Sequence, residues 1–422
     1  MLKVAIVLFL YCSASQAQGP RLWVLEAPDQ IVEYDPASFT RKNAHPVPKQ
    51  AFLFPQDLQI SRRGQMLFAA SMVREPDGFT HPSNSPSVWL WNGAIALPVM
   101  RSVSEKVTPA GANVTVESSL PRPALFADGS HIFWFDNHRK TLQKNDRSVD
   151  LSTATTFRAW QTDLMGMSPQ PLASLPFADC KCETGVCSEG CPEAGVKVPE
   201  EGVADFFVLT QWVPGQIGSD YQASLLFRKG GGKWSSTKLA HPMQDILDFA
   251  AEGSDVLLLE AVLDAGCCGW ANESSDQLIL NRGASSAIVF DERQQFQNAN
   301  YDVSFFPSRA KFSPNKHFIA MTVQASQKAT DEIRLADEGH DTPAELAQIK
   351  KNLPNMPMVQ VVPANGGSKP TASIAGCSLV GWLSDSEILM VENGMLVAFD
   401  IAKYTRRKST IKMENASYAF LR

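Results

Sequence analysis

The sequence predicts an all-β protein made of repeated four-stranded units. Three observations carry this prediction: a two-strand motif recurs along the chain, further short apolar strands follow most copies, and polar turns separate the strands. The strands are rich in β-branched and aromatic residues and are bounded by turn-forming residues. One such unit cannot bury both of its faces alone, so several must pack around a common axis. We therefore expect a single β-propeller.

The recurring motif is an apolar strand, a polar turn containing Gly or a substitute, and a second, strongly apolar strand. It occurs six times, the third copy being weak, at 58–71, 123–135, 199–210, 247–260, 310–322 and 380–392. Additional strands are expected at 87–100, 277–292 and 395–413. Four strands per copy is the size of a propeller blade.

The two ends of the chain predict a further blade. Residues 21–39 supply two or three strands but lack a first strand, and residues 416–422 supply a lone strand. Pairing the two would complete a seventh blade and close the ring, which removes an exposed sheet edge. We expect seven four-stranded blades, with six as the alternative. A β-sandwich or two unrelated β-domains is the competing interpretation.

One copy of the motif carries a family resemblance. FSPNKHFIAM (312–321) resembles the FSPDGxxIAF core of the WD40-like repeats in the propeller half of TolB. The resemblance implies a bacterial, TolB-like propeller, although Lys316 and Ser386 stand where the turn glycine is expected. It implies a fold and leaves the function open, because propellers host enzymes, ligand binders and scaffolds.

The N-terminus has the features of an export signal. Lys3 precedes an apolar run over 4–11, and small residues around Ala17 mark a cleavage site, so residues 1–17 are the expected signal peptide and 18–422 the propeller domain. We expect an exported protein, periplasmic or extracellular. No later stretch is long and apolar enough to span a bilayer. The net charge of -6 argues against a nucleic-acid surface.

Six cysteines cluster in two segments that the predicted topology places on one face of adjacent blades. The insertion 179–193 holds Cys180, Cys182, Cys187 and Cys191, and the loop 265–276 holds Cys267 and Cys268. In an exported protein, clustered cysteines indicate disulfides before metal ligands. Neighbouring cysteines rarely bond to each other. Cys267 and Cys268 would therefore each bond to a cysteine of the insertion, and its remaining two would pair. Zinc or copper binding and a redox-active vicinal pair are the alternatives. Cys377 starts an apolar strand and is expected to be a free, buried thiol.

Long connections predict the binding face. They are expected at 72–86, 136–152, 212–220, 261–276 and 323–357, the last with a helical insertion over 330–354. Long loops on a rigid scaffold commonly carry function. The binding-face candidates in them are Asp264, Trp270, Glu273, Asp276 and His340. They would contact a sugar, a peptide or a cation such as calcium; the competing interpretation is a solvated turn.

No metal-binding or nucleophile motif with standard spacing occurs, so no catalytic residue is assigned. We expect a non-catalytic binding or scaffold protein without a resident cofactor, which acts as a monomer on a protein, peptide or glycan ligand. One alternative is a hydrolase or lyase acting on glycans or peptides with carboxylates at the channel mouth. Another is a thiol-based metal or redox protein. If the protein does hold a cofactor, the alternative that we consider is calcium or zinc.

Overall fold

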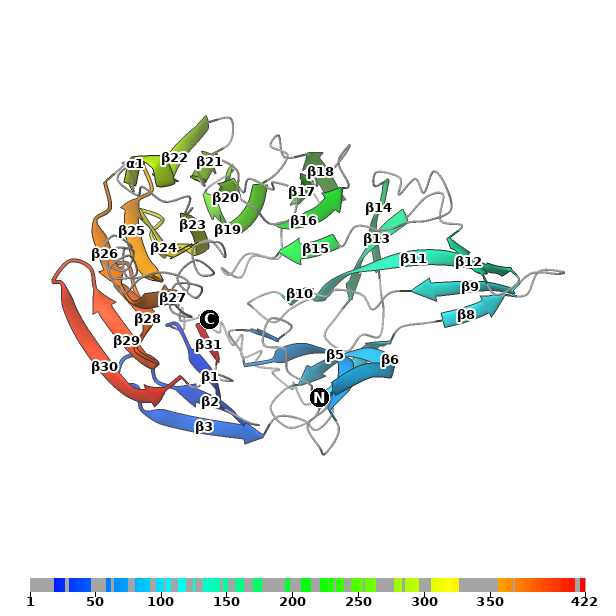
Figure 1. Cartoon of the computed structure of the whole chain (residues 1–422), viewed down its shortest axis with the longest axis horizontal. Coiled ribbons are helices and arrows are strands. Elements are labelled where there is room, and N and C mark those ends of the chain that lie inside the picture. The colour runs from blue at the N-terminus through cyan, green and yellow to red at the C-terminus, as the bar shows by residue number, and fades with distance from the viewer. Residues whose placement is uncertain are drawn as a thin grey trace, which may run out of the picture.

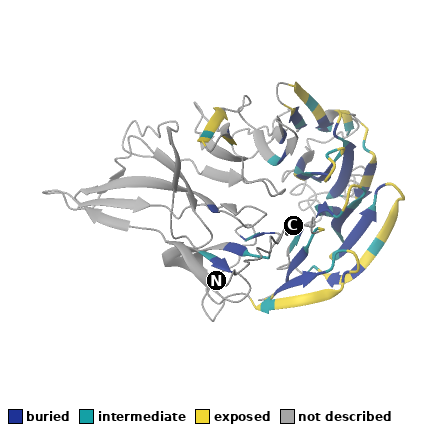
Figure 2. Ribbon diagram, turned by 180° about the vertical axis from the view of Figure 1, so that it is seen from behind, coloured by how far each residue is buried: buried dark blue, intermediate teal, exposed yellow. Residues whose placement is uncertain are grey.

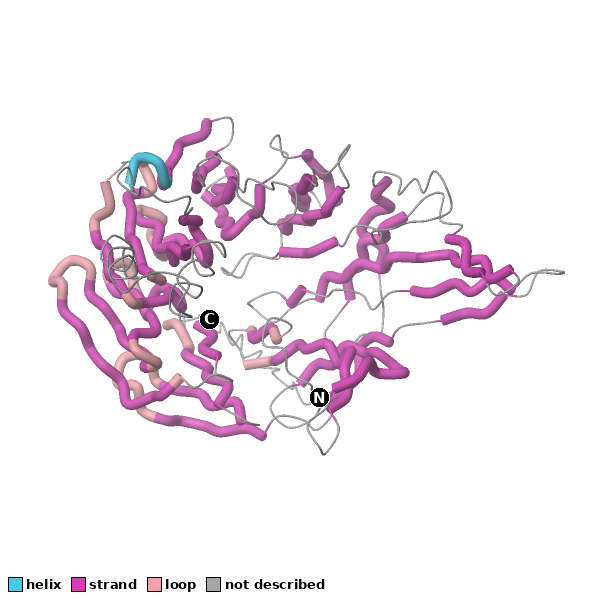
Figure 3. The backbone as a smooth tube through the Cα atoms, viewed as in Figure 1, coloured by secondary structure: helices cyan, strands magenta, loops and turns pink. Residues whose placement is uncertain are grey.

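The structure is a computed structural model of the chain. It describes residues 19–26, 30–46, 58–61, 64–74, 80–91, 96–101, 104–107, 113–118, 124–125, 132–144, 147–150, 156–162, 170–176, 194–197, 206–213, 221–230, 233–238, 244–252, 255–262, 277–282, 285–295, 305–325, 356–366, 369–413 and 418–421. These residues are nearly all β-strand, and the helix among them is the single turn α1 (Glu292–Gln295) (Figure 3).

The described strands form seven antiparallel sheets, which we number I to VII (Figure 1). Sheet I contains β3 (Arg41–Pro46), β2 (Gln30–Tyr34), β1 (Leu22–Glu26) and β31 (Tyr418–Leu421), in that order. Sheet II contains β4 (Gln59–Ile60), β5 (Met66–Arg74), β6 (Thr80–Trp91) and β7 (Ala96–Arg101). Sheet III contains β8 (Ser104–Val107), β9 (Asn113–Ser118), β10 (Ala124–Leu125), β11 (Ile132–Lys144), β12 (Arg147–Asp150), β13 (Thr156–Thr162) and β14 (Gln170–Pro176).

The remaining four sheets each follow chain order. Sheet IV contains β15 (Ala194–Lys197), β16 (Phe206–Val213), β17 (Tyr221–Gly230) and β18 (Lys233–Lys238). Sheet V contains β19 (Gln244–Glu252), β20 (Asp255–Val262), β21 (Gln277–Arg282) and β22 (Ser285–Asp291). Sheet VI contains β23 (Phe305–Phe312), β24 (Phe318–Ala325), β25 (Met358–Pro363) and β26 (Ala372–Ala375). Sheet VII contains β27 (Cys377–Trp382), β28 (Glu387–Glu392), β29 (Met395–Asp400) and β30 (Thr405–Lys412).

The predicted pairing of the two ends of the chain is present. Leu22 to Leu25 of β1 pair antiparallel with Tyr418 to Leu421 of β31. Sheet III departs from the predicted four strands, because β11 pairs with β13 through its first half and with β9 and β12 through its second half. Two predicted loops are wrong: most of 72–86 belongs to the β5–β6 hairpin, and most of 136–152 to β11 and β12. In both places polar side chains lie in paired strands, so polarity alone did not indicate a loop.

Alternate residues of a strand pack in opposite directions, so the best-described sheets are buried on both faces. In β28, Ile388 and Met390 pack toward sheet VI, whereas Leu389 packs toward sheet I. In β1, Val24 packs toward sheet VII and Trp23 toward sheet II. Figure 2 shows the buried residues concentrated within these sheets, with β3 exposed along the outside. Successive side chains of a strand point to opposite faces of its sheet. A sheet that is apolar on both faces is therefore packed between two other sheets.

Contacts connect each sheet with the next one in chain order. Sheets I and II share an apolar cluster, and the pairs of strands in contact thereafter are β4 with β10, β11 with β15, β17 with β19, β19 with β23, and β24 with β27. Sheet VII in turn contacts sheet I through β27 and β31. The first strands of sheets V, VI and VII thus converge with β31, and we call β19, β23, β27 and β31 the inner strands (Figure 1).

Two of the motif turns show why the turn position favours glycine. Gly64 has φ +80° and Lys316 has φ +62°, so both occupy the left-handed region that glycine adopts most easily. Lys316 thus substitutes for glycine in the same backbone conformation. Ser386 does not have a positive φ; its turn is held by the Ser384 hydroxyl, which accepts hydrogen bonds from the backbone N–H groups of Ser386 and Glu387.

Candidate functional site

The predicted binding-face residues and the six clustered cysteines lie outside the described residues, as does the helical insertion over 330–354. This group comprises Asp264, Trp270, Glu273, Asp276, His340, Cys180, Cys182, Cys187, Cys191, Cys267 and Cys268. The roles assigned to them stay predictions. Among the described residues, no group of three or more His, Cys, Asp or Glu side chains is arranged to hold a metal ion.

The strands that flank the two cysteine segments are described. One segment lies between β14 and β15, the first strand of sheet IV, and the other joins β20 to β21 in sheet V. Antiparallel neighbours alternate in direction, so the start of a first strand and the end of a second strand lie at the same end of a sheet. Sheets IV and V are in contact through β17 and β19. The two segments are therefore attached at corresponding ends of neighbouring sheets.

Cys377 is a free, buried thiol, as predicted. It begins β27, where its Sγ lies 3.4 Å from the Ala375 carbonyl oxygen and 3.8 Å from Glu392 Oε1. Burial, followed by the charge of Glu392, raises the pKa of Cys377 to about 11. The thiolate is thus disfavoured, and Cys377 has the character of a core residue and not of a nucleophile.

The inner strands share a feature that the sequence motif did not reveal, a β-bulge at one position. The register with the second strand shifts between Ile246 and Asp248 in β19, between Ser308 and Lys311 in β23, and between Leu379 and Gly381 in β27. Each shift lies the same distance before the motif turn. Bulges bend a strand and turn a side chain away from its regular direction, and they are frequent next to functional sites.

The bulge of β23 differs from the other two because it contains Arg309. Arg309 has φ +48°, whereas no residue over 246–248 in the bulge of β19 or over 379–381 in the bulge of β27 has a positive φ. When the first residue of a bulge is left-handed, it is normally glycine. A larger residue there costs about 1 kcal/mol or more and persists only where the surrounding structure enforces it.

Arg309 is also exposed and unpaired within the described part of the chain. Each other arginine whose side chain is described has a partner, namely Arg21, Arg41, Arg228, Arg282, Arg406 and Arg407. Arg309 thus combines a strained backbone conformation with an exposed guanidinium on an inner strand. We therefore take Arg309 and its neighbourhood as the candidate functional site.

Two other charged residues near the bulge of β23, Asp248 and Lys311, take part in contacts between neighbouring sheets. Asp248 of β19 accepts a hydrogen bond from the Phe312 N–H at 3.0 Å and lies 3.9 Å from Lys311 Nζ. On the other side, Trp382 Nε1 donates to the Lys311 carbonyl at 3.0 Å. These contacts fix β23 between its neighbours, and they leave Arg309 as the charged residue of this strand that has no partner among the described residues.

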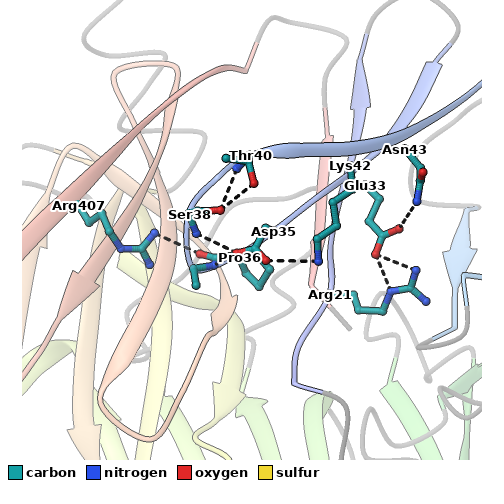
Figure 4. A network of polar contacts seen from close by, with 10 residues as sticks. Arg21, Glu33, Asp35, Pro36, Ser38, Thr40, Lys42, Asn43 and Arg407 are labelled. Atoms are coloured by element: carbon teal, nitrogen blue, oxygen red, sulfur yellow. Dashed lines mark hydrogen bonds and ion pairs between the residues drawn. The ribbon is translucent and has the colours of Figure 1, made fainter.

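A second polar cluster, in sheet I, is satisfied internally (Figure 4). The buried carboxylate of Glu33 accepts hydrogen bonds from Arg21 Nε at 2.9 Å and Asn43 Nδ2 at 3.2 Å. Register pairing places Trp23 and Asn43 opposite Glu33. The buried Glu33 carboxylate is thus paired within sheet I, which makes it a structural element.

The neighbouring turn of the same cluster connects sheet I to sheet VII. Asp35 Oδ1 accepts from the Ala37 and Ser38 N–H groups, each at 2.9 Å, and the Ser38 bond is the main reason that the pKa of Asp35 is lowered. Arg407 donates to the Pro36 carbonyl at 3.2 Å and to Glu387 Oε1 at 3.0 Å. Figure 4 shows Arg407 reaching this turn from the other sheet.

Sequence reasoning did not find Arg309, although one signal was present. When the last three motif copies are aligned on the turn residues Gly253, Lys316 and Ser386, Arg309 stands where the other two have Ile246 and Leu379. Among these three copies, a charge replaces an apolar residue at this position. The bulge that exposes Arg309 has no comparable signal in the motif.

Neither a protein-family model nor a curated protein sequence matches this chain. Among solved structures, apo AztD from Citrobacter koseri has a TM-score of 0.43 and 10% identity, over 96% of this chain and 98% of that one. The β-propeller domain of the Trilobed protease from Pyrococcus furiosus has a TM-score of 0.44 and 9% identity, over 92% and 89%. Porphyromonas gingivalis dipeptidyl peptidase 4 has a TM-score of 0.40 and 10% identity, over 91% of this chain and 50% of that one. A functional proposal for this chain must rest on its own residues.

Proposed function

We propose that the seven sheets are the blades of one closed, TolB-like β-propeller, with sheet I as the blade that joins the two ends of the chain. Two observations support this. Each sheet contacts the next and sheet VII contacts sheet I, and the strands of sheets VI, VII and I pack apolar side chains in both directions. Only a cyclic stack gives each sheet two neighbours and leaves no face uncovered.

The propeller acts, in this proposal, as an exported, non-catalytic binding protein in the periplasm or outside the cell. Its ligand is a protein, peptide or envelope component, held on the face where the long connections emerge. The observation that carries this is the attachment of both cysteine segments at corresponding ends of sheets IV and V. Long connections gathered at one end of a rigid stack form a recognition surface.

Six of the cysteines stabilise that surface in this proposal through disulfides between Cys180, Cys182, Cys187, Cys191, Cys267 and Cys268. Titration of thiols in denaturant without reductant is expected to find a single thiol in the mature chain, that of Cys377. Peptide mapping without reduction then gives the connectivity. Several free thiols together with bound zinc or copper would contradict the disulfides and favour the thiol-based alternative.

A loop replacement tests the binding face. In the variant, residues 263–276 become a Gly-Ser linker of equal length between Val262 and Gln277. In the control, the same linker is inserted between Arg282 and Ser285, at the opposite end of the same sheet. After cross-linking to a bacterial envelope fraction, partners captured by the wild type and by the control are expected to be lost from the variant. Equal capture by all three proteins would refute the proposed face.

A further inference from the structure

We infer that Arg309 binds an oxyanion group, a carboxylate or a phosphate, of the ligand that the protein recognises. The inference rests on the proposed binding function and adds to it the chemical class of the ligand. It is carried by the combination of a left-handed φ of +48°, an exposed side chain and the absence of any partner for Arg309 in the described part of the chain.

The first step is that the fold does not require an arginine at this position. The two equivalent bulges, over 246–248 in β19 and 379–381 in β27, contain no residue with a positive φ and no arginine. Glycine would adopt the conformation of Arg309 without strain. An unfavourable backbone conformation retained by a side chain that has no polar partner in the described part of the chain indicates a role outside the fold.

The second step concerns charge. Arg309 and Lys311 lie on the same strand, and Asp248, the described carboxylate in contact with that strand, already accepts from the Phe312 N–H and faces Lys311. Among the described residues the guanidinium therefore has no carboxylate partner, and in this inference an incoming anion supplies the missing charge. Its planar fork of N–H donors fits a carboxylate or a phosphate with two parallel hydrogen bonds.

The third step concerns position. β23 is an inner strand, in contact with β19 on one side and β27 on the other. Its two hydrogen-bonded ties, from Asp248 and from Trp382, hold the backbone at Phe312 and Lys311, directly after the bulge. A donor held by a rigid support loses little entropy when it binds, so a single arginine contributes substantially to affinity and selectivity.

Calorimetry with two probes, a hexaglutamate peptide and inorganic phosphate, separates the two sources of the oxyanion, and hexaglutamine is the neutral control. We expect wild-type protein to bind at least one anionic probe. Arg309→Gly should weaken that binding about 10- to 100-fold, the usual effect of losing a charge-assisted hydrogen bond. Arg309→Lys should recover part of it, because it keeps the charge and loses the fork. Lys408→Gln, which removes an exposed charge from the outer strand β30, should bind like wild type.

The urea midpoint of Arg309→Gly provides the second measurement. It should equal or exceed that of wild type, because glycine relieves the strained φ. A lower midpoint would show that Arg309 is structural and would overturn the inference, as would equal binding by Arg309→Gly and Lys408→Gln or no binding of either probe at millimolar concentration. None of these results changes the expected capture of envelope partners by the loop surface. The inference about Arg309 can therefore be refuted while the proposed binding function stands.

Discussion

Single residues determine how tightly the sheets of this protein approach each other. Gly64 lies in a motif turn beside Trp23, whose indole is almost fully buried between sheets I and II. A Cβ added at Gly64 would lie 2.8 Å from Trp23 Cζ2, and the φ of +80° already disfavours a side chain there. The glycine is therefore required both by the turn and by the packing of the next sheet.

Gly64→Ala is expected to lower the free energy of unfolding by about 2 kcal/mol, from backbone strain and from displacement of the indole. Gly19→Ala is the control, since a Cβ at Gly19 would meet no atom within 4 Å. Urea unfolding followed by tryptophan fluorescence measures both variants. Equal midpoints would contradict the tight contact between Gly64 and Trp23.

Cys377 gives the protein a stability term that depends on pH. The pKa of this thiol rises from 9.0 to about 11 on folding, mainly through burial. A raised pKa favours the folded state fully below about pH 9, and the contribution is lost as the pH rises through about 11. We expect the urea midpoint to fall between pH 8 and pH 11 by more in the wild type than in Cys377→Ala. Parallel curves for the two proteins would show that the thiol does not titrate with this shift.

At the scale of the elements, neighbouring strands are joined by a few directional bonds in addition to apolar packing. Thr322 of β24 is fully buried, and its Oγ1 accepts a hydrogen bond at 2.9 Å from the N–H of Leu379, in the bulge of β27. The bulge frees this N–H from the ladder of its own sheet, and the neighbouring sheet satisfies it. Such a bond fixes the position of β27 relative to β24 more closely than packing would.

Thr322→Val keeps the shape of the side chain and leaves the Leu379 N–H buried without an acceptor. We expect it to lower the free energy of unfolding by about 2 kcal/mol. Thr410→Val, the same change at an exposed position of β30, should have an effect within about 0.5 kcal/mol. Chemical denaturation of the two variants side by side distinguishes a lost hydrogen bond from a general effect of the substitution.

At the scale of the whole molecule, the N-terminal sheet is completed by the C-terminal strand. β31 pairs with β1, and Leu421 packs into the cluster that joins sheets VII and I. Gly381 of β27 gives room for this contact, because a Cβ there would lie 3.3 Å from Leu421 Cδ2. The short strand therefore contributes both hydrogen bonds to sheet I and apolar contacts to sheet VII.

Truncation after Met413 removes β31 and exposes the edge of β1. We expect a loss of several kcal/mol of stability from the lost apolar contacts and backbone pairing. We also expect self-association through the open edge, since an unpaired strand invites pairing with another chain. Thermal unfolding and light scattering test this, with removal of Arg422 alone as the control. A truncated protein that stays monomeric with an unchanged melting temperature would refute the role of β31.

The sequence indicated the repeated features of the fold and missed those that depend on local pairing. Patterns within short segments indicated the two-strand motif, the pairing of the terminal segments, the buried thiol of Cys377 and the turn position of Lys316. The bulges did not, because one extra residue in a strand hardly changes its apolar pattern. The double pairing of β11 and the strain at Arg309 were missed for the same reason: both depend on which strand lies alongside.

The pairing of β1 with β31 also has a consequence for the order of events during biosynthesis. All other described strands lie between the two in the sequence, so β31 leaves the ribosome after every one of them. Until then sheet I has three strands and an open edge, and joining it requires closing a loop of almost the whole chain. Completion of sheet I is therefore a late step, and the edge of β1 stays open until β31 has been synthesised.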